Sequence, residues 1–237
     1  MTGNRFFRYA LRTTAMTGAR DFYAGVVGAQ FWASDVCVTP LPERAAALGT
    51  PAHWLGHVGI SDVEGTASRV VALGGQRLGP TQRGADGSLQ AVLRDPFGAI
   101  VAVSSETIAP GHAPVGWHLH NSQDHERTFA LYAALFGWTA TDVLDLGPQG
   151  GRHQMFAWDE SGRSIGSMAD LARLPHVHPQ WLFFFRVPNI EDALARVRRH
   201  GGKELGPTRI STGDIVAPCD DPQGAAFGLF QSMDDVG

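Results

Sequence analysis

One phrase occurs twice in this chain, and the repeat restricts the folds open to it more than any other feature. The first occurrence begins at Trp54 (WLGHVGISDVEGTASRVVALGGQRLGPT) and the second at Trp181 (WLFFFRVPNIEDALARVRRHGGKELGPT), an offset of 127 residues (181 − 54). Each continues to an Asp-Pro-x-Gly sequence, at 95–98 and at 221–224. Self-similarity at a long period indicates that whole structural units are repeated. The chain is therefore predicted to be a duplication, with a first and a second copy.

The repeat also extends in front of the phrase, but at a shorter offset. Strand-like residues at 6–13 and 116–122 each precede a helix pattern, in which Tyr23 and Tyr132 match at an offset of 109 (132 − 23). The first copy therefore lacks 18 residues (127 − 109), about the length of one hairpin. In that interval the second copy has three strand-like runs, 138–146, 151–158 and 164–170, whereas the first copy has only 31–39. The first copy is predicted to have lost a hairpin.

The phrase itself predicts a strand, a helix and further strands. Asp62 and Asn189 are N-cap residues, Gly-Gly pairs at 74–75 and 201–202 end the helices, and Asp-Pro-x-Gly fits a type I turn before a last strand. Each copy thus contains two βαβββ modules. We predict an α+β fold, in which tandem modules pair into two curved mixed sheets with helices outside and a cleft within; a sandwich without a cleft is the alternative. The predicted domains are 1–108 and 116–237, joined by a linker at 109–115.

Charge and composition exclude several classes of partner. A net charge of −4 and a pI near 6.2 do not favour nucleic acid, and no apolar run approaches the roughly 18 residues of a membrane span. Cys37 and Cys219 do not match between the copies, so no disulfide framework is expected. The first residues lack the apolar segment of a signal peptide, and we expect a cytoplasmic protein. A monomer and a homodimer both remain open.

The repeated segments resemble the vicinal oxygen chelate superfamily, which includes glyoxalases, bleomycin resistance proteins and extradiol dioxygenases. The resemblance rests on FYAGVVGAQF and LYAALFGW, on LPERAAALGTPAHWLGHV, on the helix end GG-x-x-LGP and on DP-x-G. It covers nearly the whole chain and is closest to four-module bacterial glyoxalase-like proteins. It implies the fold but leaves the activity open, because this fold hosts lyases, dioxygenases, isomerases, thiol transferases and metal-free drug-binding proteins.

In metal-dependent members, the resemblance implies His or Gln ligands on the first strand of each module and Glu on the last strand. The matching first-strand positions are Arg8, Leu55, Trp117 and Leu182. The matching last-strand positions are Ala102, Gly228 and, with a less certain alignment, Val36 or Cys37 and Ile165 or Gly166. None of the six well-aligned residues is a usual ligand, since divalent ions need oxygen, nitrogen or thiolate donors. No metal or other cofactor is therefore expected.

Strand alternation predicts which side chains face each cleft. In the second copy these are Trp117, Leu119, Asn121, Leu182, Phe184, Arg186, Gly228 and Phe230, an apolar and aromatic set with one cation. In the first copy they are Arg8, Ala10, Arg12, Leu55, His57, Ala102 and Ser104, a more polar and cationic set. His118 and His120 are expected to face the helix. The alternative is that the aromatic residues only fill the core.

Three functions remain. The first is a metal-free protein that binds an aromatic or polycyclic small molecule, with Arg186 pairing with an anionic or carbonyl group. The second is a metal-independent tailoring enzyme, a cyclase, isomerase or hydrolase, for which His57, Arg12, Arg186 and His153 are the candidate acid/base residues. The third is a lyase or dioxygenase with relocated metal ligands such as His57 and His53. We expect them in that order.

Overall fold

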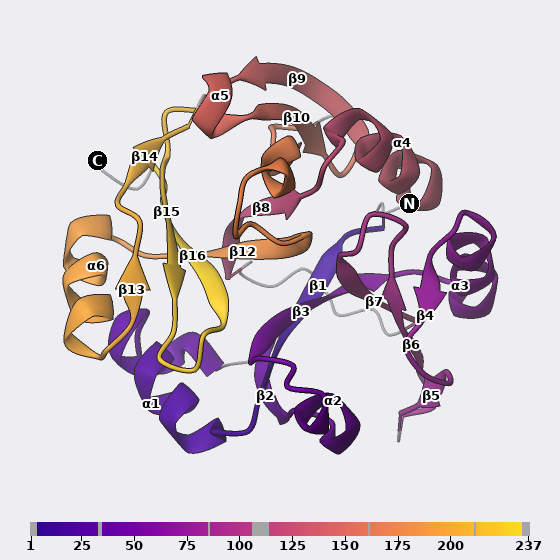
Figure 1. Cartoon of the computed structure of the whole chain (residues 1–237), viewed down its shortest axis with the longest axis horizontal. Helices are drawn as coiled ribbons and strands as arrows, with labels where there is room; N and C mark the ends of the chain where they lie inside the picture. The colour runs from indigo at the N-terminus through magenta and orange to yellow at the C-terminus, as the bar shows by residue number, and fades with distance from the viewer. Residues whose placement is uncertain are drawn as a thin grey trace. The chain divides into compact units, whose positions relative to one another are not determined.

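The computed structural model describes residues 4–32, 35–84, 86–105, 114–160, 162–210 and 212–233. The first copy forms, in order, β1 (Phe6–Thr13), α1 (Met16–Val26), η1 (Ala29–Trp32), β2 (Val36–Pro40), α2 (Glu43–Ala47), β3 (His53–Gly59), α3 (Val63–Ala72), β4 (Gln76–Arg77), β5 (Gln82–Arg83), β6 (Leu89–Arg94) and β7 (Ile100–Ser104). These strands make one sheet in the order β2-β1-β3-β7-β6-β4, with β5 paired to β6 (Figure 1).

The second copy makes the other sheet. It forms β8 (Val115–Asn121), α4 (His125–Phe136), β9 (Thr139–Asp145), α5 (Gly147–Gly150), β10 (Arg152–Ala157), β11 (Gly166–Ala169), η2 (Asp170–Arg173), β12 (Gln180–Arg186), α6 (Ile190–Arg199), β13 (Lys203–Glu204), β14 (Thr208–Arg209), β15 (Ile215–Asp220) and β16 (Ala226–Gln231). The strand order is β13-β15-β16-β12-β8-β11-β10-β9, with β14 paired to β15. Both sheets mix parallel and antiparallel pairs. The predicted fold class, α+β with two curved mixed sheets, is confirmed.

The two copies differ between their first helix and the repeated phrase. In the second copy, β11 pairs in parallel with β8, and the antiparallel pair β9–β10 precedes it. In the first copy, β2 pairs in parallel with β1, and among the described residues of 27–52 no strand corresponds to β9 or β10. The extra hairpin is thus a feature of the second copy.

Packing divides the chain in a way that the repeat does not indicate. Among the described residues, one compact unit takes in 4–7, 56–105 and 118–181, and the other takes in 8–55, 114–117 and 182–233. The division passes through β1, β3, β8 and β12, so each unit contains part of both sheets. The predicted linker lies mostly outside the described residues, and the domain boundaries drawn from the repeat stay a prediction.

Local sequence signals set the helix ends as predicted. The Asp62 side chain accepts a hydrogen bond from the Gly65 amide at the start of α3, and Asn189 accepts from the Asp192 amide at the start of α6. Such N-caps satisfy amides that have no partner within the helix. Helix α4 ends at Gly137, whose φ of 78° lies in the left-handed region that favours glycine.

In the first unit, a buried cluster forms around the Asp95 of the first Asp-Pro-x-Gly turn. One carboxylate oxygen of Asp95 accepts from the Phe97 and Ala99 amides, which fixes the turn. The other accepts from His120 Nε2 at 2.8 Å and from the Tyr132 hydroxyl at 2.9 Å. The Tyr132 oxygen in turn accepts from the indole of Trp181 at 2.9 Å. Turn, strand and helix are therefore joined through one carboxylate.

The second unit repeats this cluster without the histidine. Asp221 accepts from the Gln223 and Ala225 amides and from the Tyr23 hydroxyl at 3.3 Å. The Tyr23 oxygen accepts from the indole of Trp54. The first-copy position that corresponds to His120 is Leu11 (120 − 109), which has no polar atom in its side chain.

The two carboxyl groups are expected to affect the pH dependence of stability in opposite directions. Burial would raise the pKa of Asp95, but the hydrogen bond and charge of His120 and the bonds from Tyr132 and Phe97 lower it. The pKa of Asp221 is raised, because the effect of burial is larger than that of the hydrogen bonds from Ala225, Gln223 and Tyr23, which lower it. Stability from Asp95 is present above the unfolded pKa of about 3.9 and is lost as the pH falls through the lower folded pKa. For Asp221, the folded state is less stable with the carboxyl ionised than with it protonated, and this difference is relieved as the pH falls through its raised folded pKa.

Urea unfolding between pH 7 and pH 3 measures both effects. Asp95→Asn should lose less stability than the wild type over the acid limb, and Asp221→Asn should lose more. Parallel curves for the two variants would contradict the assignment.

Candidate functional site

The second-copy surface in the second unit is built from β12 and β16. The strands run parallel, pairing Phe184 with Gly228 and Arg186 with Phe230. A Cβ atom on Gly228 would lie 2.0 Å from Cδ1 of Phe184, so the ring occupies the space that this glycine leaves free. Gly116 likewise leaves room for the ring of Phe230. The two glycines therefore leave the space that the two phenylalanine rings occupy.

Arg186 is the charged residue of this surface. Its guanidinium carbon lies 5.0 Å from the centre of the Phe230 ring, and the side chain is half-buried. Its backbone amide donates to the Pro114 carbonyl, but its guanidinium makes no hydrogen bond or ion pair with any described residue. A guanidinium stacked on a ring keeps its N–H groups available at its edge. We refer to Arg186, Phe230, Phe184 and Gly228 as the Arg186 surface.

The structure places the predicted second-copy lining deeper than an open cleft requires. Seven of the eight residues are buried, namely Trp117, Leu119, Asn121, Leu182, Phe184, Gly228 and Phe230, and Arg186 is half-buried. Leu119 and Asn121 lie in the first unit and the others in the second. Asn121 is 6% exposed and its Oδ1 has no hydrogen-bond partner among the described residues. Strand alternation predicts which face of the sheet a side chain lies on, but it does not predict how far that side chain is buried.

The first-copy residues are also divided between the units. Arg8 and Arg12 are half-buried in the second unit with Ala10 and Leu55, which are buried. His57, Ala102 and Ser104 are buried in the first unit, where the His57 ring meets the Phe7 ring edge-on at 6.4 Å. Burial lowers the pKa of the Arg12 guanidinium.

The remaining histidines of β8 and β10 are engaged in hydrogen bonds. His118 Nδ1 lies 3.0 Å from the Ile165 carbonyl, and His120 Nε2 donates to Asp95. That both histidines face the helix stays a prediction. His153 Nε2 donates to the Gly150 carbonyl at 2.8 Å, which leaves Nδ1 to accept from the Ser167 hydroxyl at 3.0 Å. Burial lowers the pKa of His153, which keeps the ring neutral at pH 7.

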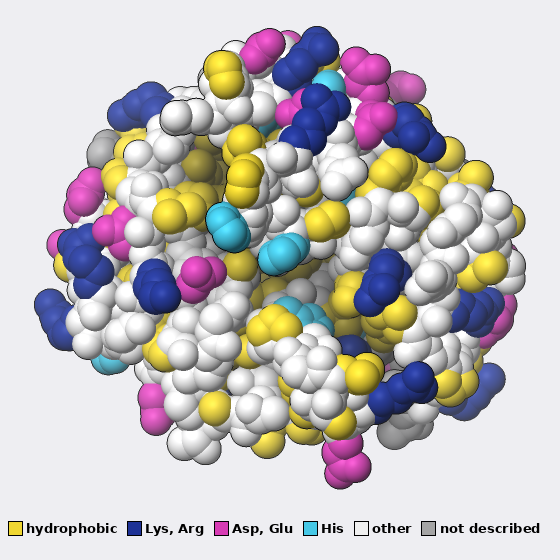
Figure 2. Space-filling model, in the orientation of Figure 1, with side chains coloured by type: hydrophobic (Ala, Val, Ile, Leu, Met, Phe, Trp, Pro, Cys, Tyr) yellow, Lys and Arg dark blue, Asp and Glu magenta, His cyan; other side chains and the backbone are white. Residues whose placement is uncertain are grey.

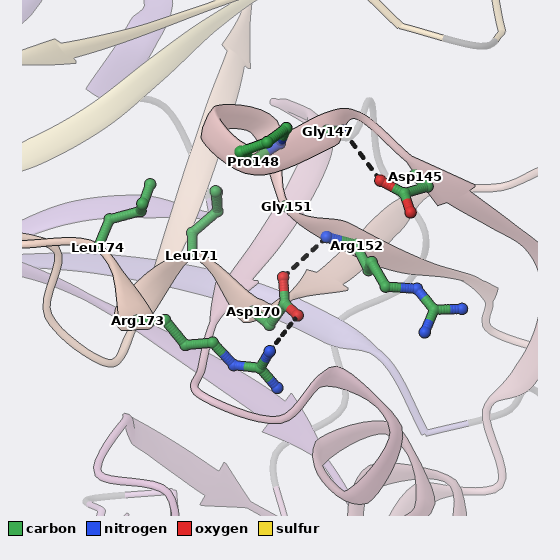
Figure 3. Close-up of a pocket in the computed structure, with 9 residues that line it drawn as sticks. All are labelled: Asp145, Gly147, Pro148, Gly151, Arg152, Asp170, Leu171, Arg173 and Leu174. Atoms are coloured by element: carbon green, nitrogen blue, oxygen red, sulfur yellow. Dashed lines mark hydrogen bonds and ion pairs between the residues drawn. The ribbon is translucent and has the colours of Figure 1, made fainter.

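A pocket of about 420 Å³ lies in the first unit, and its residues were not predicted from the sequence (Figure 3). It is lined by Asp145, Gly147, Pro148, Gly151, Arg152, Asp170, Leu171, Arg173 and Leu174. Asp170, 7% exposed, accepts from the Arg152 amide at 2.7 Å and pairs with Arg173 at 3.1 Å. Leu171 points toward the turn at Pro148 (Figure 3). The β9–β10 hairpin, which has no counterpart among the described residues of the first copy, supplies one wall of this pocket. The difference in length between the copies is the signal that could have indicated the pocket.

The surface charges do not gather by sign on the face shown in Figure 2, where Lys and Arg side chains are interspersed with Asp and Glu. No helix among the described residues is long and apolar enough to cross a membrane.

The paired βαβββ modules and the two mixed sheets define the vicinal oxygen chelate fold, as the sequence resemblance predicted. Residues 116–229, which make up most of the second copy, match the family model of the Glyoxalase/Bleomycin resistance protein/Dioxygenase superfamily. The chain is 24% identical over 249 residues to proteins named "Putative glyoxylase CFP32" from Mycobacterium bovis and Mycobacterium tuberculosis. The match covers 93% of this chain and 92% of each relative.

Solved structures share the fold at lower identity. The 2,3-dioxygenase LapB from Pseudomonas sp. KL28 superposes with a TM-score of 0.66 and 14% identity, over 98% of this chain and 93% of that one. The Mn(II)-bound glyoxalase from Novosphingobium aromaticivorans gives 0.62 and 14%, over 97% and 82%. At this identity the likeness concerns the fold alone.

The residues of this chain do not fit the divalent ion that such relatives suggest. Among the described residues, no three His, Cys, Asp or Glu side chains lie close enough together to hold an ion. At Gly228, where the resemblance implies a glutamate, the ring of Phe184 already occupies the space of a Cβ atom. Trp117 and Leu182, at first-strand positions, are buried side chains without a ligand atom suited to such an ion. We therefore derive no chemistry through a metal at these positions.

Proposed function

We propose that this protein binds a small molecule without a metal ion, and that the ligand joins an aromatic ring to a carboxylate or carbonyl group. One observation carries the proposal: the half-buried guanidinium of Arg186 is stacked on Phe230 and has no partner among the described residues. Removing a cation from water without a partner is unfavourable, so an oxygen of a ligand would stabilise it.

The packing of the phenylalanine rings indicates how such a ligand would sit. Phe184 and Phe230 are 1% and 3% exposed, so a ligand cannot insert fully between them. It would place its oxygen at the free edge of Arg186 and its ring against the neighbouring apolar atoms. Arg186 should therefore contribute more to affinity than Phe184, because charge-assisted hydrogen bonds are lost completely when the cation is removed.

Thermal unfolding with paired probes tests this function. We expect 1-naphthoate to raise the unfolding temperature of chelator-treated protein, and the neutral 1-naphthamide to have a much smaller effect. A ligand at 100 times its dissociation constant adds about 2.7 kcal/mol of stability. Arg186→Gln should weaken naphthoate binding at least tenfold, about 1.4 kcal/mol. Arg199→Gln, an exposed arginine of α6 in the same unit, is the matched control. Equal binding by both variants would place the site elsewhere.

A metal-independent enzyme is the second candidate, and the His153–Ser167 pair is the observation that favours it. A neutral imidazole that accepts from a serine hydroxyl is an arrangement used to activate nucleophiles. Ser167 is only 1% exposed, however, so a substrate would need the strand ends to open. Mass spectrometry of a bound ligand after incubation separates the two functions. Unchanged ligand supports binding, whereas a product lost in Ser167→Ala supports the enzyme.

A further inference from the structure

A second half-buried arginine, Arg12, lies on β1. The parallel pairing of β1 with β2 sets Arg12 beside Thr39, and both side chains are half-buried. Side chains of directly paired residues lie on the same face of a sheet. Arg8 is on that face too, but four residues earlier, roughly 13 Å away at the rise of a strand. Arg12 and Arg8 therefore lie toward different ends of the strand.

Arg12 lacks the partners that usually accompany a guanidinium out of water. It makes no hydrogen bond or ion pair with any described residue, and the Thr39 hydroxyl makes none either. A guanidinium has five N–H donors, and burying them without acceptors is unfavourable. Burial accordingly lowers the pKa of Arg12. An acceptor supplied from outside the chain would remove this cost.

His53 lies on the other side of Arg12. Strand β3 is the sheet neighbour of β1 opposite β2, and His53 is its first residue. Nδ1 of His53 donates to the Pro51 carbonyl at 3.0 Å, so Nε2 carries no proton when the ring is neutral. Burial, and then the charge of Arg12, lower the pKa of His53. The ring is neutral at pH 7, and Arg12 is close enough to act on it electrostatically.

We propose that the first copy has a site for a small monocarboxylate, in which the Arg12 guanidinium binds the carboxylate beside the hydroxyl of Thr39 and the ring of His53. The planar fork of a guanidinium matches the two oxygens of a carboxylate. One unpaired positive charge balances one negative charge, which favours a carboxylate over a phosphate dianion. The Thr39 hydroxyl supplies a further donor. This site is separate from the Arg186 surface, since it lies on the other sheet.

The test uses acetate as the probe and the His53 ring as the reporter. An anion bound at Arg12 offsets the positive charge that lowers the pKa of His53. We therefore expect saturating acetate, but not chloride at equal ionic strength, to raise the pKa of His53 in an NMR titration of its Cε1 proton. Arg12→Gln should raise this pKa without acetate and abolish the effect of acetate, with at least a tenfold loss of affinity.

Matched variants make the outcomes distinct. Arg44→Gln, an exposed arginine on α2, should respond to acetate as the wild type does. Arg186→Gln should also keep the acetate effect, so failure of this site and failure of the proposed function are separable. The proposal would be overturned if acetate still raised the pKa of His53 in Arg12→Gln, or if it did not raise it in the wild type.

Tighter binding of inorganic phosphate than of acetate at pH 8 would overturn the choice of a carboxylate as the ligand. Thermal unfolding of Arg12→Gln verifies its folding, and we expect it to be at least as stable as the wild type.

Discussion

Replacing Asp95 with alanine is expected to lower the free energy of unfolding by about 3–5 kcal/mol at pH 7, as expected for removal of one partner of a buried polar pair. The side chain is 4% exposed and accepts four hydrogen bonds, from the Phe97 and Ala99 amides, His120 Nε2 and the Tyr132 hydroxyl. Without the carboxylate, all four donors lose their acceptor, and three of them, the Ala99 amide, His120 and Tyr132, are buried. Urea denaturation followed by circular dichroism measures the loss.

Asp221→Ala is the internal control for this prediction, because the second unit repeats the cluster without a histidine. Its carboxylate accepts from the Gln223 and Ala225 amides and from Tyr23, the last at a longer 3.3 Å. We expect a loss of about 1–3 kcal/mol, since fewer donors are left unsatisfied. His120→Leu, which copies the residue at the corresponding position of the first copy, should reduce the difference between the two aspartates. Equal losses for Asp95→Ala and Asp221→Ala would show that His120 adds nothing to the first cluster.

The parts of the fold that follow from short stretches of sequence could be predicted. The caps at Asp62 and Asn189 depend on residues within one helical turn, and both were predicted. The predicted strand at 6–13 coincides with β1, because aromatic and other apolar residues recur through it. Turns at 95–98 and 221–224 also formed, with the Gly98 and Gly224 amides donating to the first carbonyl of each turn.

The parts that depend on distant residues could not be predicted. The turn sequence indicates that Asp95 binds nearby amides, but nothing in it shows that His120 and Tyr132 also bind this carboxylate. Alternation placed Phe184 and Gly228 on one face, yet the contact between them depends on the register of β12 with β16. The pocket at Asp170 depends on how η2 packs beside the hairpin of the second copy. These are products of tertiary packing, and a single sequence carries no periodic signal for them.

The candidate site, too, could be predicted from the sequence only in part. The residue types at the positions of the metal ligands argued against a metal, because the side chains of leucine and tryptophan, and glycine, offer no atom that usually binds a divalent ion. Which of several arginines lacks a partner is decided by the surroundings of each. Arg198 pairs with Glu204 and Arg77 pairs with Glu64, whereas Arg12 and Arg186 have no such partner among the described residues. The proposals rest on these two arginines for that reason.

Placing a glutamate at Gly228, where the resemblance implies a metal ligand, is expected to destabilise the protein by about 3 kcal/mol or more without creating a metal site. A Cβ atom there would lie 2.0 Å from the Phe184 ring, which is 1% exposed and has little room to turn. A buried carboxylate without a donor adds a desolvation cost to this clash. Calorimetry with Mn²⁺ and urea unfolding measure the two outcomes.

Gly228→Ala separates the clash from the charge, and we expect it alone to cost about 1–3 kcal/mol. In the background of Phe184→Ala, where the ring is absent, the same substitution should cost much less, giving a coupling energy of at least about 1 kcal/mol. Gly79→Ala and Gly79→Glu are the controls, because Gly79 is exposed and no atom lies within 4 Å of its added Cβ. Additive effects of Gly228→Ala and Phe184→Ala would contradict the contact. Tight Mn²⁺ binding by Gly228→Glu would show that the surface can still hold an ion, and the arginine-based account of this site would then be wrong.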